Sequence, residues 1–116
     1  MDFDRLTVAL LVLREDAPEL TEEQEADLQD AHLAHLAGLH EAGYLVAAGP
    51  LRDPDSYYRG LSILSVGVEE ARALKEADPA VKAGKFRVIV LPWMLPSGAL
   101  HFSPTKFPRS RAEAAG

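Results

Sequence analysis

One stretch near the start of the chain, residues 6–13, predicts a strand that is apolar on both faces. Successive side chains of a strand point to opposite faces of its sheet. Both sets are mostly apolar here: Leu6, Val8, Leu10 and Val12 alternate with Thr7, Ala9, Leu11 and Leu13. Strands of this kind occur in sheets that are covered on both sides. The fold must therefore supply two covering layers.

Capping and turn signals divide most of the remaining chain into helices and strands. A first helix is predicted to begin at the capping box Thr21-Glu22-Glu23-Gln24 and to run to about Ala42, where Gly43 stops it. The other predicted elements are strands at residues 44–51, 60–66 and 85–91 and a short helix at 68–77. The order βαββαβ favours an α+β, ferredoxin-like fold: a four-stranded antiparallel sheet with both helices on one face.

Two helices cover only one face of this sheet, so the second face needs another cover. A large exposed apolar patch is unfavourable on a monomer. A second copy of the sheet is the simplest cover, which predicts a homodimer packed through its sheet faces. The alternative is that the residues after Leu95 fold back over the sheet, but their prolines and low apolar content make this cover weaker.

The chain is expected to divide into an α+β domain at residues 1–95 and a partly ordered C-terminal extension at residues 96–116. The extension is locally basic and proline-containing, and it carries Lys106, Arg109 and Arg111. This composition favours a loosely ordered, solubilising tail.

The composition excludes several classes of function. The chain has no cysteine, which removes disulfides, thiolate catalysis and Cys-based metal centres. A net charge of −6 disfavours binding to nucleic acid. The acidic start of the chain, Met1-Asp2-Phe3-Asp4, is unlike a signal peptide, and the apolar stretch at 6–13 is far shorter than the roughly 20 residues that span a bilayer. A cytoplasmic protein without a membrane partner is expected.

The predicted first helix carries three histidines at different angles around its axis. His32 falls near the centre of the inward stripe, whereas His35 lies toward one edge and His40 toward the other margin, at a solvated helix end. The stripe itself consists of Leu28, Leu36 and Leu39, with Leu33 at its margin. His32 is therefore expected to be buried or to line a pocket, with the other two more exposed. It is either a core histidine or a group for proton transfer.

A metal site is a weaker interpretation of the same histidines. His32 and His35 form an i, i+3 pair, but a robust site needs a third ligand. His101 could supply one only if the C-terminal extension folds back. The sequence therefore predicts neither a metal nor a cofactor.

Asp78 is the carboxylate best placed to act with His32. Its position before Pro79 fits the N-cap of a one-turn helix that ends at Gly84, and this role alone could explain the residue. Antiparallel packing of the two helices would also bring Asp78 beside the N-terminal half of the first helix. A contact there would fix the imidazole tautomer and raise the basicity of His32.

Four segments together resemble the YciI-like (YCII-related) family over roughly residues 5–95. They are Ala31–Leu36, Leu45–Pro50, Ala77–Gly84 and Val88–Trp93. The resemblance implies a dimeric α+β barrel, related in fold to muconolactone isomerases, with a proposed histidine–aspartate active site at His32 and Asp78. His35 lies where the family motif requires no particular residue. One similar dehydrochlorinase acts on a chlorinated hydroxyquinol.

Two classes of function remain. The first is a cofactor-independent lyase or isomerase that acts on a small cyclic or aromatic compound, with His32 as general acid/base and Asp78 orienting it. The alternative is a non-catalytic dimeric module that binds a small molecule or a protein partner, with His32 in a structural role. A cavity shared by both residues would favour the enzyme.

Overall fold

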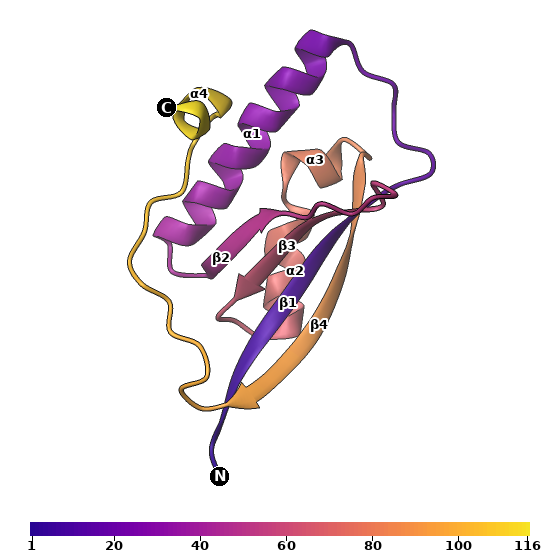
Figure 1. Ribbon diagram of the computed structural model, residues 1–116. Coiled ribbons are helices and arrows are strands. Elements are labelled where there is room, and N and C mark those ends of the chain that lie inside the picture. Colours follow the sequence, from indigo (N-terminus) through magenta and orange to yellow (C-terminus); the bar gives the residue numbers. More distant parts are fainter.

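Four strands form one antiparallel sheet in the order β2-β3-β1-β4 (Figure 1). The computed structural model describes all of residues 1–116. The two central strands each pair with both neighbours, and the strands are β1 (Phe3–Leu13), β2 (Leu45–Pro50), β3 (Tyr58–Leu64) and β4 (Phe86–Pro96). This arrangement confirms the predicted α+β, ferredoxin-like fold.

The first three helices lie where the local signals predict, and a fourth falls in the segment that was expected to be a loosely ordered tail. The helices are α1 (Glu22–Glu41), α2 (Val68–Glu76), α3 (Pro79–Lys82) and α4 (Arg111–Ala115). At the start of α1, the Gln24 N–H donates to the Thr21 hydroxyl at 3.1 Å and the Thr21 N–H donates to the Gln24 side chain at 2.9 Å. Gly43 follows α1 with a φ of 88°, the left-handed backbone expected there. No helix combines the length and the apolar character needed to cross a bilayer.

The core lies between the sheet and α1 and α2. On β1, the buried side chains Thr7, Ala9 and Leu11 point toward the helices. Leu39 of α1 and Ala71 of α2 pack against this face, together with Leu45, Leu64 and Val90. Both long helices therefore cover the same face of the sheet, as predicted.

The other face of the sheet is apolar and has no helix on it. In register, Leu6, Val8 and Leu10 lie opposite residues of β4 and β3: Trp93, Leu91, Ile89, Ile63 and Leu61. Leu91 is 50% exposed and Trp93 is 39% exposed. We call these eight residues the open sheet face.

The fourth strand is longer than the sequence predicts. It was expected to end at Leu91 before Pro92, but β4 continues to Pro96 and pairs with β1 over its full length. The prediction was wrong because β4 is an edge strand, where a proline is tolerated if its missing N–H would face away from the neighbouring strand. Pro92 lies opposite Thr7 and does not interrupt the pairing.

The segment after β4 returns along α1, as Figure 1 shows by its orange to yellow course. The Phe107 ring stacks on the His40 ring with centroids 4.0 Å apart. Arg109 pairs with Glu41, and Arg111 pairs with Asp30 at 3.2 Å. The segment then forms α4, with the Ser110 hydroxyl as its N-cap. These contacts differ from the loosely ordered tail that the composition favours, and they leave the open sheet face uncovered.

Candidate active site

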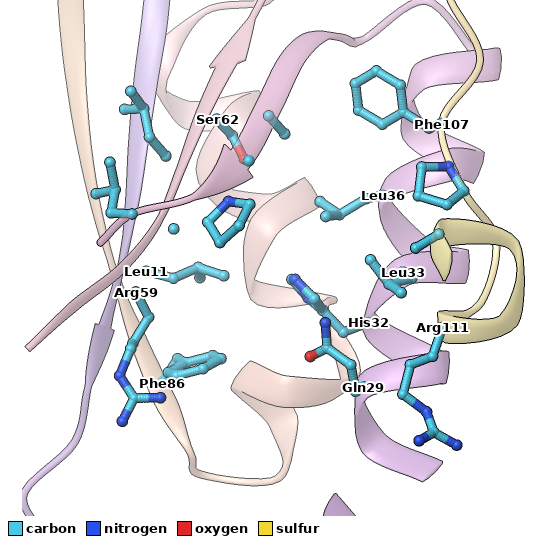
Figure 2. Close-up of a pocket in the computed structure, with 18 of the residues that line it drawn as sticks. Leu11, Gln29, His32, Leu33, Leu36, Arg59, Ser62, Phe86, Phe107 and Arg111 are labelled. Atoms are coloured by element: carbon cyan, nitrogen blue, oxygen red, sulfur yellow. The ribbon is translucent and has the colours of Figure 1, made fainter. Parts of the chain in front are cut away.

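His32 points from α1 toward the sheet, as Figure 2 shows. Its side chain is 13% exposed, and its Nδ1 lies 2.6 Å from Oδ2 of Asp78. The contact joins residues 46 positions apart in the chain. Antiparallel packing of the helices made this contact plausible and the family resemblance predicted it, and the structure contains it.

The two oxygens of the Asp78 carboxylate have different partners. Oδ1 accepts a hydrogen bond from the Ala80 N–H at 2.9 Å and so caps α3, while Oδ2 faces His32. The whole residue is 0% exposed. The structural role of Asp78 as an N-cap and its contact with the histidine therefore exist together.

The surroundings of Asp78 keep it ionised. Burial acts to raise the pKa of its carboxyl group, but the hydrogen bond and charge of His32, the Ala80 N–H and the charge of Lys75 together hold that pKa below its ordinary value. An ionised carboxylate only accepts hydrogen bonds. Nδ1 of His32 is therefore the donor, which leaves Nε2 as the ring nitrogen that can take up a proton.

A pocket of about 680 Å³ lies between α1 and the sheet, with His32 in its wall. Figure 2 shows the labelled side chains of α1 facing those of the strands across this space. Helix α1 contributes Gln29, His32, Leu33 and Leu36, and the strands contribute Leu11 and Ser62, among others. The volume lies within the range of small-molecule sites.

The C-terminal segment supplies a further wall of the pocket. Phe107, Pro108 and Arg111 line it from this segment, together with residues of α4. Since the sequence interpretation treated residues 96–116 as a tail, it did not place them at the site.

The other helix histidines do not line this pocket. His35 Nε2 donates to the Leu74 carbonyl at 3.0 Å, and His40 Nδ1 donates to the Leu45 carbonyl at 2.7 Å. Both are half-buried, as His32 is, but His32 is the one of the three that lines the pocket, as expected, and His40 does not lie at a solvated helix end. For His40 the reason is the stacked ring of Phe107, which covers what the sequence predicts to be a solvated helix end. No cluster of three His, Cys, Asp or Glu side chains forms around His32 and His35.

Lys75 is a pocket residue that sequence reasoning missed. It is 0% exposed, and its Nζ donates to the Ser62 hydroxyl at 3.1 Å. Burial lowers the pKa of Lys75, while the charge of Asp78 acts to raise it. The available signal was its spacing, because Lys75 follows the buried Ala71 by one helical turn and Val68 by two.

Comparison with known proteins places the chain in a family. The YCII-related domain matches residues 8–94. The protein YciI of Escherichia coli O6:H1 strain CFT073 is 35% identical over 72 residues, which cover 55% of this chain and 74% of that protein. The protein YciI of Shigella flexneri matches with the same identity and coverage.

A solved structure resembles the fold over most of its length. It is the 5-chloro-2-hydroxyhydroquinone dehydrochlorinase TftG from Burkholderia phenoliruptrix AC1100, in complex with 2,5-dihydroxybenzoquinone. The TM-score is 0.56 and the sequence identity is 25%, with 76% of this chain and 92% of that chain covered. The match therefore extends over nearly all of that enzyme.

Proposed function

The chain belongs to the YCII-related domain family, and from this premise we propose that it is a lyase or isomerase that moves a proton on a small cyclic or aromatic compound. His32 is the general acid/base and Asp78 orients it. The observation that carries the proposal is the 2.6 Å contact between Nδ1 and Oδ2 at the wall of a pocket of about 680 Å³.

The pair supplies the parts that proton transfer needs. Asp78 fixes the tautomer of His32, so Nε2 accepts a proton from a bound substrate and later returns it. The imidazolium that forms in between is stabilised by the carboxylate beside it. Proton transfer of this kind needs no cofactor.

The similarity to TftG supports the substrate class. That enzyme is a dehydrochlorinase, and its complex holds a hydroxylated six-membered ring. Loss of hydrogen chloride from a ring removes a proton and a chloride ion, so a base is needed but no oxidant. A mostly apolar pocket of the observed size suits a substituted ring.

The site also belongs to a homodimer in this proposal. The open sheet face presents apolar side chains on three strands, including Leu91 and Trp93, to solvent in the single chain. A second copy of the same face would bury them in an isologous contact. The partner copy would thus be the second covering layer that β1, which is apolar on both faces, requires.

The alternative is a non-catalytic module that binds the same kind of molecule. The cap that Asp78 provides for α3 favours it, because this contact alone would keep the residue at its position. The two proposals differ in whether the wild-type protein turns such a compound over or only binds it.

The test is a set of matched histidine variants. A panel of chlorinated and hydroxylated hydroquinones is incubated with the protein, and turnover is followed by ultraviolet absorbance and chloride release. We expect His32→Asn to lower turnover by about 10² to 10⁴-fold, the usual contribution of a general acid/base. His35→Asn is the control, because His35 lies on the same helix outside the pocket. Undiminished turnover in His32→Asn would eliminate the acid/base assignment, whereas wild-type protein that binds these compounds without turning them over would favour the binding module.

A further inference from the structure

The charged groups that line the pocket all have one sign. They are Arg59, Lys75, Lys85 and Arg111, and no aspartate or glutamate lies among the lining residues. This is unexpected in a chain whose net charge is −6. The pocket wall therefore gathers basic side chains in an acidic protein.

Two of these cations lack an ionic partner. Lys85 is paired with Glu25 at 2.6 Å and Arg111 with Asp30, so their charges are largely compensated. Arg59 donates to a backbone carbonyl, and Lys75 donates to a hydroxyl. Neither Arg59 nor Lys75 forms an ion pair.

Lys75 is the more deeply placed of the two. It is 0% exposed, whereas Arg59 is only half-buried. An ammonium group in such a position is costly unless a counter-charge or a hydrogen bond compensates it. Its hydrogen-bonding partner, Ser62, is itself 4% exposed and lies in the pocket wall (Figure 2). The charge of Asp78 compensates the ammonium group in part, and an anion in the pocket would add to that compensation.

The Ser62 hydroxyl can accept a hydrogen bond from Lys75 and donate one to a ligand at the same time. An ammonium group only donates hydrogen bonds, so the Ser62 oxygen is the acceptor in the contact with Lys75. The hydroxyl hydrogen of Ser62 then remains available, and the cation behind it makes it a stronger donor. A ligand oxygen that meets this hydroxyl is favoured when it carries negative charge.

We propose that Ser62, backed by Lys75, binds an anionic oxygen of the substrate, so that the substrate class is a ring compound in its phenolate or enolate form. Ser62 contacts the oxygen directly, and Lys75 is a positioning residue that acts through it. The inference rests on the proposed function, because His32 works on the same bound ring. Removal of a proton by His32 increases negative charge on such an oxygen, and the Ser62 hydroxyl stabilises that charge.

The experiment is an equilibrium titration of 4-nitrophenol, whose phenolate and phenol forms have different absorption spectra. Saturating wild-type protein is expected to bind the phenolate about ten times more tightly than the phenol, which lowers the apparent pKa of the bound probe by about one pH unit. Lys75→Met and Ser62→Ala should each abolish most of this preference. Lys82→Met is the matched control, because Lys82 is exposed on α3 outside the pocket.

The results separate this inference from the proposed function. His32→Asn should keep the preference for phenolate, even though it loses turnover. If the preference disappears in His32→Asn and persists in Lys75→Met, the inference is overturned. It is also overturned if wild-type protein binds both forms equally or does not bind 4-nitrophenol. If Lys75→Met does not fold, the wild-type titration and Ser62→Ala still give the answer. Turnover that survives in His32→Asn would overturn the proposed function and leave the phenolate result standing.

Discussion

A single carboxylate at Asp78 joins three parts of the molecule. Its Oδ1 caps α3, its Oδ2 holds His32 of α1, and its charge lies near Lys75 of α2. The Asp-Pro signal predicted the cap. Helix phase and antiparallel packing made the contact with His32 plausible, and the family resemblance predicted it. None of these signals was sufficient for Lys75, because a lysine at an inward helix position normally extends its ammonium group to water. Only the packed structure shows that this one stays inside.

Two substitutions at Asp78 separate its charge from its cap. Asp78→Asn keeps a good N-cap but loses the charged hydrogen bond to His32, so the free energy of unfolding at pH 7 should fall by about 2 kcal/mol. Asp78→Ala should lose roughly 1 kcal/mol more, because the cap is also removed. Chemical denaturation of the three proteins measures both differences. Equal stability of the two variants would contradict the cap.

The difference in free energy of unfolding between wild type and Asp78→Asn should depend on pH, because the pKa of Asp78 is lowered in the folded protein. A carboxyl whose pKa is lower in the folded state stabilises the fold fully above its unfolded value of about 3.9, and this contribution is lost as the pH falls through the folded value. The gap between wild type and Asp78→Asn should therefore narrow below about pH 4. A stability difference that widens below about pH 4 would mean that folding raises the pKa of Asp78 rather than lowering it.

Lys75→Met is expected to stabilise the protein while it removes the proposed anion site. Methionine has a similar length, and burial of an apolar side chain avoids the desolvation of the ammonium group, so the free energy of unfolding should rise by about 1 kcal/mol at pH 7. Because burial lowers the pKa of Lys75, this gain should shrink as the pH rises toward the ordinary lysine value of about 10.4. Denaturant titrations of both proteins at several pH values measure this gain. A Lys75→Met variant that is less stable than wild type at pH 7 would show that the lysine stabilises the fold.

At the scale of elements, local signals predicted what local interactions decide. The capping box of α1, the left-handed Gly43 and the N-cap of α3 were all predicted from a few adjacent residues. Long-range pairing decided the rest. The strand β4 runs through Pro92 because all of β1 is available as its partner, and no local pattern in the sequence reports that.

The C-terminal segment is the element that most changes the pocket. Phe107, Pro108 and Arg111 form one wall, yet the family match ends at residue 94. Deletion of residues 98–116 should leave the four-stranded sheet folded and weaken binding of 4-nitrophenolate roughly tenfold, which corresponds to about 1.4 kcal/mol. Circular dichroism checks the fold and calorimetry measures the affinity. Full-strength binding by the shortened chain would show that this wall contributes no binding energy.

At the scale of the whole molecule, charge and apolar surface are separated. The pocket with its basic side chains lies between α1 and the sheet, while the open sheet face on the other side carries no charged side chain among its eight residues. One surface therefore suits an anionic ligand and the other suits a second apolar surface.

Leu91 tests whether the open sheet face is the dimer contact. It lies opposite Val8 near the middle of this face and is 50% exposed in the single chain. Wild-type protein should be a dimer at micromolar concentration with more than about 1,000 Å² buried in total. Leu91→Arg should give a folded monomer, because each copy would place an unpaired charge in an apolar contact. Sedimentation equilibrium measures the mass of both proteins.

The matched control for this substitution is Glu23→Arg, a new arginine at an exposed position of α1 on the other side of the sheet. It should remain a dimer, which separates the effect of position from that of added charge. Wild-type protein that sediments only as a monomer would refute the homodimer. A Leu91→Arg variant that remains a dimer would place the contact on a different surface. If the prediction holds, the β1 side chains Leu6, Val8 and Leu10, which no helix of this chain covers, are covered by the sheet of the second copy.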